Sequence, residues 1–348
     1  MQLDERKKQV LAVVVDTYIR TGEPVGSKAV LPMLDVSVSS ATVRNDMAAL
    51  ERLGLLEQPH TSAGRVPSYS GYRYYISHLM KPQPLTAQEK RQIDDLLAGA
   101  DFSGDMVVEQ AVDLLSELTG YAIVGTRSLP HFSVITRVEV IPAGRRVYAL
   151  LMITSDGSVK NKICRLEFDL TEEQLEFFSR FVQEHVAGMQ VASMNPAMIQ
   201  NMAVALGSYM MSLSPLLFGI YELSANMQKK QVSMRGEERL LAQEGMNPSD
   251  VITLIRQKED LSRLLIDAFD GIHVVFGQED SGFAIGNSSL ILSSYGRKGA
   301  VEGSLGLIGP IRINYKHIIP YMEYFSERMT RMLSDMVEDG KEQETDGK

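Results

Sequence analysis

The sequence has no tryptophan and only one cysteine, Cys164, among its 348 residues. A lone cysteine excludes both a disulfide within the chain and a cysteine-based zinc site, and this scarcity is typical of the reducing cytoplasm. No apolar run approaches the roughly 18 residues that a membrane span requires. The run from Val10 to Val15 is also too short for the core of a signal peptide. We therefore expect a cytoplasmic protein that makes no contact with a membrane.

Sequence signatures of catalysis and of cofactor binding are missing as well. The six histidines include no pair at helical spacing, so no metal site is predicted. Gly303, Gly306 and Gly309 follow the spacing G-x-x-G-x-x-G without the Lys-Ser/Thr of a phosphate-binding loop, and we interpret them as part of a tightly packed strand. No nucleophile elbow is present. We predict a protein that is not an enzyme and needs no cofactor.

Acidic residues outnumber basic residues, but not in every part of the chain. The net charge is -9, whereas the first 80 residues contain nine basic and eight acidic side chains, which leaves them at +1 and the remainder at -10. Any contact with nucleic acid is therefore expected to be local and to involve the N-terminal segment. Pro82 and Pro84 end this segment with an extended connector.

The periodicity of apolar residues predicts an α+β protein of several domains. Helical spacing is expected over residues 87–98, 107–118, 170–245, 251–269 and 315–336. Strands are expected over residues 121–126, 134–141, 147–154, 159–168, 272–276, 289–294 and 304–313. Asp156-Gly157 predicts a tight hairpin, and therefore antiparallel pairing. We interpret this order as an antiparallel sheet domain that is interrupted by a mainly helical insertion.

These patterns divide the chain into five parts. The predicted parts are an N-terminal domain (1–80), a linker (81–88), a sheet domain in two pieces (89–169 and 246–337), an inserted domain (170–245) and a disordered tail (338–348).

The N-terminal segment has the element order of a winged helix-turn-helix. Helices are expected over residues 3–20, 28–34 and 41–53, with Ser27 and Ser39-Ser40 as N-caps, and a hairpin with a loop at 60–65 follows. The third helix turns small, polar and basic side chains outward. Arg44 and Asn45 on this face have the chemistry that pairs with guanine and adenine in the major groove. The alternative is that these residues are merely solvated.

The candidate contacts to double-stranded DNA lie at the short helix, on the third helix and in the loop. Arg65, in the loop, is expected to reach a phosphate or the minor groove. The full set is Lys28, Ser39, Ser40, Thr42, Arg44, Asn45, Arg52, Thr61, Ser62 and Arg65.

Two further patterns each allow two interpretations. Met194, Met198 and Met202 form a stripe at helical spacing, which suits either a core or an adaptable interface, and we predict that they contribute to dimerisation. Tyr72 and Tyr75 share one face of a predicted helix. A helix that seals the N-terminal domain is favoured there over an aromatic platform for single-stranded nucleic acid.

Three motifs closely resemble the bacterial heat-inducible transcription repressors known as HrcA. They are Ser39–Met47 (SSATVRNDM), Gly54–Pro67 (GLLEQPHTSAGRVP) and Gly71–Tyr75 (GYRYY), and a weaker similarity extends to Gly303–Arg312. The resemblance implies a winged-helix domain, a GAF-like domain and an inserted dimerising domain. It also implies that a homodimer binds an inverted-repeat operator upstream of chaperone genes, with activity that depends on the chaperonin. Ser68-Tyr69-Ser70 departs from the family, where charged residues are more usual.

We therefore predict a negative regulator of heat-shock gene transcription whose active level is set by the availability of chaperonin. The alternative is a regulator whose GAF-like domain binds a small effector, which a metabolite-dependent affinity for the operator would reveal. An enzyme in the same domain would instead be revealed by turnover.

Overall fold

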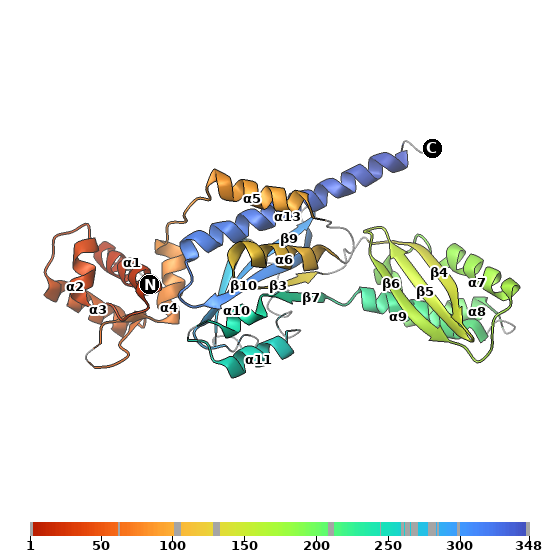
Figure 1. The fold of residues 1–348 in the computed structure, drawn as a ribbon, viewed down its shortest axis with the longest axis horizontal. Coiled ribbons are helices and arrows are strands. Elements are labelled where there is room, and N and C mark those ends of the chain that lie inside the picture. The colour runs from red at the N-terminus through yellow and green to blue at the C-terminus, as the bar shows by residue number, and fades with distance from the viewer. Residues whose placement is uncertain are drawn as a thin grey trace.

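The chain consists of three parts placed along one long axis in the computed structural model (Figure 1). They are an N-terminal domain, a central domain and an inserted domain. None of the described helices is both long and apolar enough to cross a membrane. The structure describes residues 3–61, 63–100, 106–127, 133–207, 212–243, 245–258, 261, 265, 271–277, 283, 285–297 and 300–345.

The N-terminal domain packs helices against a small two-stranded sheet. Asp4 begins the first helix by accepting a hydrogen bond from the Lys7 amide (2.8 Å), and Gly22 ends it in the left-handed conformation (φ 72°). The elements are α1 (Glu5–Thr21), α2 (Ser27–Val30), a 3-10 turn (Leu31–Met33), α3 (Ser40–Arg52), β1 (Leu56–Glu57), β2 (Val66–Pro67), α4 (Tyr69–Tyr74) and a π-helical turn (Tyr75–Leu79).

The central domain is built on an antiparallel five-stranded sheet with the order β7-β3-β10-β9-β8. Its strands are β3 (Ala122–Arg127), β7 (Gln231–Arg235), β8 (Ile272–Phe276), β9 (Ser288–Arg297) and β10 (Ala300–Pro310). Its helices are α5 (Ala87–Ala98), α6 (Met106–Thr119), α10 (Glu237–Leu241), α11 (Pro248–Arg256) and α13 (Tyr315–Thr345). The helix predicted over residues 87–98 is confirmed in full.

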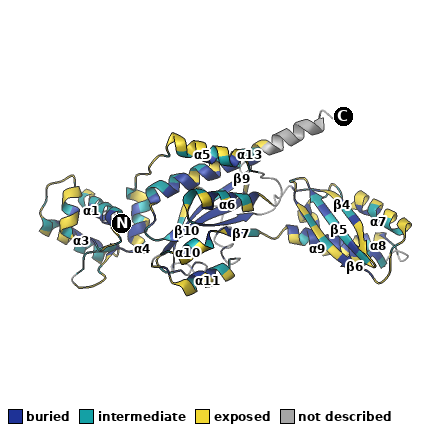
Figure 2. Ribbon diagram, viewed as in Figure 1, coloured by how far each residue is buried: buried dark blue, intermediate teal, exposed yellow. Residues whose placement is uncertain are grey.

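Helices cover both faces of this sheet, so its strands are buried (Figure 2). Neighbouring strand residues therefore enter different cores. Ile123 faces the core that contains α6 and α13, whereas Val124 faces the core that contains α10 and α11. The predicted tight packing at the glycines of β10 is confirmed, because a side chain at Gly306 would lie 3.0 Å from Val124 Cγ1 and 2.8 Å from Leu290 Cδ1.

The inserted domain combines a three-stranded antiparallel sheet with helices on one of its faces. It contains β4 (Ile135–Gly144), β5 (Val147–Thr154), β6 (Val159–Arg165), α7 (Glu172–His185), a 3-10 turn (Val191–Ser193), α8 (Pro196–Ala205) and α9 (Ser214–Met227). The hairpin predicted at Asp156-Gly157 is confirmed between β5 and β6.

The insertion differs from the predicted range 170–245 at both ends. Strands β4 to β6 pair with one another and not with the central sheet in the described part of the chain, so the insertion includes them. At its other end, β7 returns to the central sheet and pairs with β3, so that Gln231 faces Arg127. Strand periodicity predicts that a segment is a strand but does not identify the sheet that it joins.

The C-terminal segment also differs from its prediction. Helix α13 continues to Thr345, so the disordered tail predicted from residue 338 is wrong over 338–345. Glu, Lys and Gln are good helix formers, and extending a helix that already exists is far easier than starting one. Residues 346–348, and most of the predicted helix after Arg256, lie outside the described residues.

One continuous hydrophobic core joins the N-terminal and central domains. Tyr72 packs against Phe276 and Tyr315, with ring centroids 5.8 Å and 6.0 Å apart. Asp16 of α1 accepts hydrogen bonds from the Tyr75 hydroxyl (2.5 Å) and from Lys316 Nζ of α13 (2.7 Å). The sealing role predicted for the Tyr72 face is therefore confirmed. A stacking platform is excluded because Tyr72 and Tyr75 are only 0% and 1% exposed.

Candidate nucleic-acid interface

Helix α3 presents a small, polar and basic face to solvent. Val43, Met47 and Leu50 are buried, as their spacing predicts. On the other side of the helix Ala41, Arg44, Asn45 and Arg52 are exposed. The helix therefore has its backbone close to the surface at Ala41, and hydrogen-bonding groups beside it.

Hydroxyl groups gather where α3 begins. Ser39 is the N-cap, since its Oγ accepts a hydrogen bond from the Thr42 amide (3.1 Å), and it lies 2.9 Å from Thr42 Oγ1. Ser40 Oγ lies 3.0 Å from Ser27 Oγ. The prediction that Ser27 caps the short helix is wrong, because Ser27 is the first residue of α2 and Gly26 occupies the N-cap position without a side-chain cap. Ser27 instead links α2 to α3.

The loop between β1 and β2 is held by its own backbone and by Gln58. Gln58 Nε2 donates hydrogen bonds to the carbonyls of Thr61 (3.0 Å) and Ala63 (3.1 Å). Val25 and Arg65 exchange two backbone hydrogen bonds of 2.9 Å each. A side chain at Gly64 would overlap the Val25 backbone, so glycine is required there. Ser62 lies outside the described residues.

The side chain of Arg65 lies against α3. Its Nε and NH2 atoms are 2.9 Å and 2.8 Å from Glu51 Oε2, and the side chain is 18% exposed. This geometry fixes the loop to the end of α3, which the sequence did not indicate.

A hollow of about 460 Å³ separates α2 and α3 from the loop. Lys28, Arg44, Thr61 and Arg65 line it, and no acidic side chain does so among its described lining residues. Four of the predicted residues thus meet at one basic hollow. Ser39, Ser40 and Thr42 lie at the start of α3, and Asn45 and Arg52 lie on its exposed face.

Asp46 is a positioning residue that the sequence analysis missed. Its side chain is 6% exposed and accepts hydrogen bonds from Arg6 Nε (2.6 Å) and Arg6 NH2 (3.2 Å), which ties α3 to the start of α1. The signal was available, since position 46 falls on the same helical stripe as Val43, Met47 and Leu50. An acidic residue on a buried stripe requires a partner.

The comparisons with known proteins agree along almost the whole chain. A family profile described as "HrcA protein C terminal domain" matches residues 105–319. The chain belongs to the HrcA family. The "Heat-inducible transcription repressor HrcA" of Acetivibrio thermocellus is 31% identical over 344 residues, covering 97% of this chain and 98% of the relative. The protein of the same name from Desulforudis audaxviator is 32% identical over 343 residues, covering 97% and 99%.

A solved structure supports the fold of this HrcA-family chain. A crystal structure described as a hypothetical protein at 2.2 Å resolution is 25% identical, with a TM-score of 0.59 over 96% of this chain and 98% of the other.

The methionine stripe lies in the core of the inserted domain in this HrcA-family chain. Met194 and Met202 are 3% and 5% exposed, and Met198 packs partly buried against the same core. The prediction that these three side chains form an interface is therefore corrected, because helical spacing gives the same pattern for a core as for an interface.

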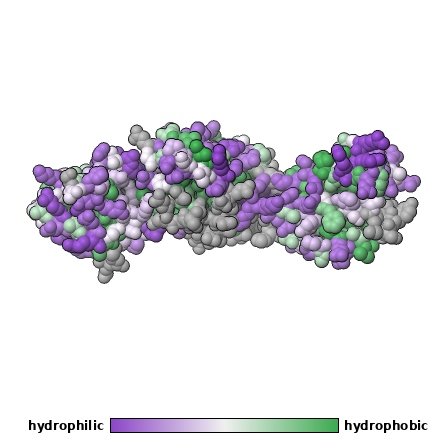
Figure 3. Space-filling view, turned by 90° about the horizontal axis from the view of Figure 1, so that it is seen from below, coloured by the Kyte–Doolittle hydropathy of each residue, from purple (hydrophilic) through white to green (hydrophobic). Residues whose placement is uncertain are grey.

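Apolar side chains are instead exposed on the open face of the inserted sheet. Ile141, Ala149 and Ile163 stand opposite one another across three strands, and Ile141 and Ile163 are 46% and 60% exposed. Val159 is 46% exposed and faces Ile153 across the β5–β6 pair. Apolar patches are visible on the inserted domain in Figure 3. Every second residue of a strand lies on the same face of its sheet, so the sequence positions of these apolar residues could have indicated an exposed apolar face.

Proposed function

We propose that this chain represses heat-shock genes by binding double-stranded DNA through its N-terminal domain. In this proposal residues 1–80 form a winged helix-turn-helix, α3 enters the major groove, and the loop between β1 and β2 is the wing. The observation that carries the proposal is the exposed Arg44–Asn45 face of α3 beside the basic hollow. The family's name, heat-inducible transcription repressor, supports it. The central domain is the GAF-like domain of this scheme.

The division of labour within the interface follows from chemistry. Arg44 and Asn45 point to solvent from α3, and their side chains can bind guanine or adenine edges in a bidentate manner. Lys28 and Arg65 flank the helix, where a phosphate backbone would pass. Glu51 holds the Arg65 guanidinium in place and offsets its charge, so Arg65 can offer a phosphate a hydrogen-bond donor in a fixed position.

The test compares specific with non-specific binding. A duplex selected by the purified protein from a random-sequence pool serves as operator, and a shuffled duplex of equal composition serves as the non-specific DNA. Asn45→Ala and Arg44→Ala should each lose about 1–3 kcal/mol on the operator and much less on shuffled DNA. Arg20→Ala is the matched control, since Arg20 is exposed in the last turn of α1 and does not line the basic hollow. Equal losses on both duplexes would contradict a role in sequence recognition.

We further propose that two copies associate through the open face of the inserted sheet. An inverted repeat requires a two-fold symmetric protein, and the row of Ile141, Ala149 and Ile163 offers a self-complementary apolar surface. Ile163→Lys should produce a monomer in sedimentation and reduce operator affinity to that of a half-site. Val204→Lys is the control, because Val204 is 76% exposed on α8, away from this sheet. If the Ile163→Lys protein remained dimeric, the dimer interface would have to lie elsewhere on the molecule.

The same apolar face supports the proposed dependence on chaperonin. A chain with an unpaired apolar face is prone to misassembly, and a chaperonin that recovers such chains raises the concentration of active dimer by mass action. Chaperonin with ATP should raise the active fraction, measured by stoichiometric operator titration, without changing the affinity of molecules that are already active. An active fraction that ignores chaperonin, together with an affinity that responds to a metabolite, would instead indicate an effector-sensing regulator.

A further inference from the structure

The inserted domain is joined to the central domain at one narrow place (Figure 1). The chain leaves the central sheet after Arg127, the last residue of β3, and returns to it at Gln231, the first residue of β7. These two residues face each other across the β3–β7 pair, so the two crossings of the chain lie side by side. Two adjacent crossings can act as a hinge unless a further contact holds the domain.

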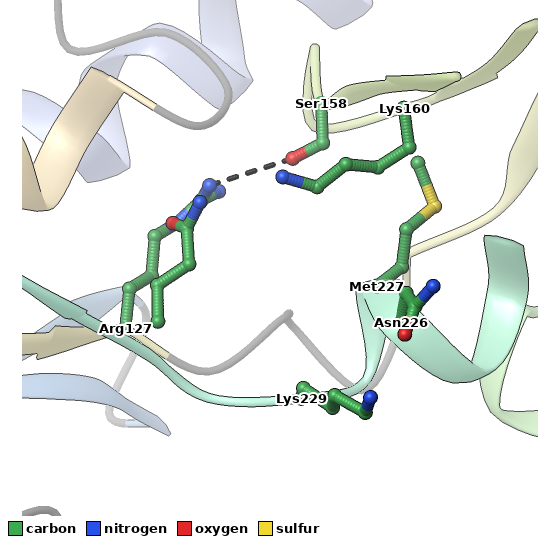
Figure 4. A pocket seen from close by; sticks show the side chains of 7 residues that line it. Arg127, Ser158, Lys160, Asn226, Met227 and Lys229 are labelled. Carbon is green, nitrogen blue, oxygen red and sulfur yellow. Dashed lines mark hydrogen bonds between the residues drawn. The ribbon is translucent and has the colours of Figure 1, made fainter. Parts of the chain in front are cut away.

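Hydrophobic packing does not continue across this junction in the described part of the chain. The core of the inserted domain lies between Ile135 and Met227 and shares no residue with the cores of the central domain. Residues of both domains, among them Arg127 and Ser158, instead line a cavity of about 30 Å³ at the junction (Figure 4). The orientation of the inserted domain therefore depends on polar contacts.

A buried ion pair supplies such a contact. Arg127 NH2 donates a hydrogen bond to Asp156 Oδ2 (2.7 Å), and the two side chains are only 3% and 1% exposed. Arg127 NH1 also donates to Ser158 Oγ (3.4 Å), which is the dashed line in Figure 4. Asp156 and Ser158 belong to the turn between β5 and β6. The contact therefore links the end of a central strand to a hairpin of the inserted sheet.

The carboxylate of Asp156 is also fixed from within its own domain. Its Oδ1 accepts hydrogen bonds from Ser133 Oγ (2.8 Å) and Thr154 Oγ1 (2.6 Å). Its Oδ2 accepts one from Ser158 Oγ (2.7 Å) in addition to the one from Arg127. Because these bonds hold the carboxylate in place, it presents a fixed acceptor to the central domain. Separating such a pair is costly, since it leaves a buried carboxylate without the cation that it faces.

This contact lies on the path that connects the two DNA-reading helices of a dimer. In the function proposed above, on which this inference rests, α3 reads DNA and two copies associate through the inserted sheet. The N-terminal and central domains share one hydrophobic core, so they are expected to move as a unit. The junction between the central and inserted domains therefore sets the distance and the relative rotation of the two α3 helices.

We propose that Arg127 and Asp156 are positioning residues for operator recognition, because their contact fixes the spacing of the two half-sites that one dimer binds. A rigid dimer loses little conformational freedom when its second α3 reaches DNA, so its affinity is high for one spacing and low for others. A dimer with a released junction accepts more spacings, each at a lower effective concentration of the second α3. Neither residue contacts DNA in this proposal.

The experiment measures the affinity of the full-length protein for three duplexes by fluorescence anisotropy. The first duplex is the inverted repeat that the protein selects from a random pool, and the second contains a single half-site. The third has about five base pairs added between the half-sites, which rotates one of them by about half a turn of DNA. The test variant is Asp156→Asn. The control is Glu184→Gln, which removes an exposed carboxylate on α7 of the same domain.

We expect wild type and Glu184→Gln to bind the lengthened repeat no more tightly than the half-site. In Asp156→Asn the ratio of the affinities for the selected and lengthened repeats should fall by at least about tenfold, with an unchanged affinity for the half-site and an unchanged dimer in sedimentation. A loss of folded protein weakens binding of all three duplexes alike and leaves this ratio unchanged. The ratio therefore separates positioning from stability.

Ser158→Ala is the second variant and replaces Asp156→Asn if that protein does not fold. It removes one hydrogen bond from Arg127 and one from Asp156, so it should lower the same ratio by a smaller factor. An unchanged ratio in the folded, dimeric variant would overturn this inference and leave the proposed function intact. A wild-type protein that binds the selected repeat no more tightly than the half-site would instead overturn the proposed function, and this inference with it.

Discussion

Gly22 and Gly54 are a matched pair for measuring one contact between domains. Both adopt the left-handed conformation, with φ of 72° and 73°. A side chain at Gly22 would collide with the guanidinium of Arg312 in the central domain, whereas Gly54 has open space around it. Gly54→Ala should therefore cost about 1–2 kcal/mol from backbone strain alone, and Gly22→Ala should cost only slightly more, because the overlap involves the end of the flexible Arg312 side chain, which can move away. Urea unfolding followed by circular dichroism measures both.

The excess cost at Gly22 should disappear when its neighbour is removed. In an Arg312→Ala background, Gly22→Ala is expected to cost as much as Gly54→Ala does. An unchanged excess in that background would assign the effect to α1 itself.

Asp46 and its neighbour Asn45 should separate stability from recognition. Asp46→Asn weakens the charged hydrogen bonds to Arg6 and should lower the free energy of unfolding by about 1–3 kcal/mol. Asn45→Ala removes an exposed side chain and should change stability by less than about 0.5 kcal/mol while weakening operator binding. Urea midpoints and operator titrations of both variants provide the comparison. A fully stable Asp46→Asn protein would show that the Arg6 contact does not anchor α3.

The buried and exposed faces of α3 were predictable residue by residue, because the helical repeat of 3.6 residues per turn determines which side chains share a face. The pairing of Arg65 with Glu51 was not, since these residues are 14 positions apart and meet only through the course of the loop. Burial of Asp46 was predictable in position but not in its partner, because Arg6 comes from another helix 40 residues away.

Among the secondary-structure elements, strands β4, β5 and β6 were predicted at nearly their observed positions, and so was the hairpin that joins the last two. Their sheet was not predicted, because alternation reports one buried face and does not identify what covers it. Strand β7 was assigned to the helical insertion because its five residues are too few for a clear period.

The pairing of Arg127 with Gln231 predicts where the inserted domain can be removed. These residues face each other on antiparallel strands, so a two-residue Asn-Gly turn can replace residues 128–230. The shortened chain should remain a folded monomer in sedimentation equilibrium.

Removal of residues 170–245 is the contrasting deletion. It deletes β7 and exposes the edge of β3, so this protein should aggregate. A monodisperse product from the second deletion and an aggregated product from the first would contradict the observed boundaries.

At the scale of the whole molecule, acid should loosen the junction between the central and inserted domains. Burial alone would raise the pKa of Asp156, but hydrogen bonds from Thr154, Ser158 and Ser133 and the charge of Arg127 lower it below its ordinary value of 3.8. A lowered pKa means that the folded protein favours the ionised form. Its stabilising contribution is therefore complete well above pH 3.8 and is lost as the pH falls through that value toward the lower pKa of the folded state.

The measurement compares wild type with Asp156→Asn over a range of pH. The difference in their free energies of unfolding should be largest near neutral pH and should shrink below pH 3.8. Asp335→Asn, which removes a carboxylate at an exposed position on α13, serves as the control variant. A difference between wild type and Asp156→Asn that stays constant over this range would show that ionised Asp156 does not stabilise the junction.

The three-part organisation was predictable from the order of the secondary-structure elements and from the resemblance to the HrcA family. The contact between the N-terminal and central domains was not predictable. That contact depends on aromatic side chains from distant parts of the sequence, Tyr72, Phe276 and Tyr315, which no local pattern brings together.

Because one hydrophobic core spans the N-terminal and central domains, the N-terminal domain cannot be exchanged between proteins as an independent unit. A recombination event at the proline-containing linker would separate Tyr69 and Tyr72 from Phe276 and leave half of a core on each fragment. The unit that can be inherited intact is therefore the pair of domains together. Diversification of DNA preference in this lineage is thus expected to proceed by point substitution on the exposed face of α3, which contributes little to that core.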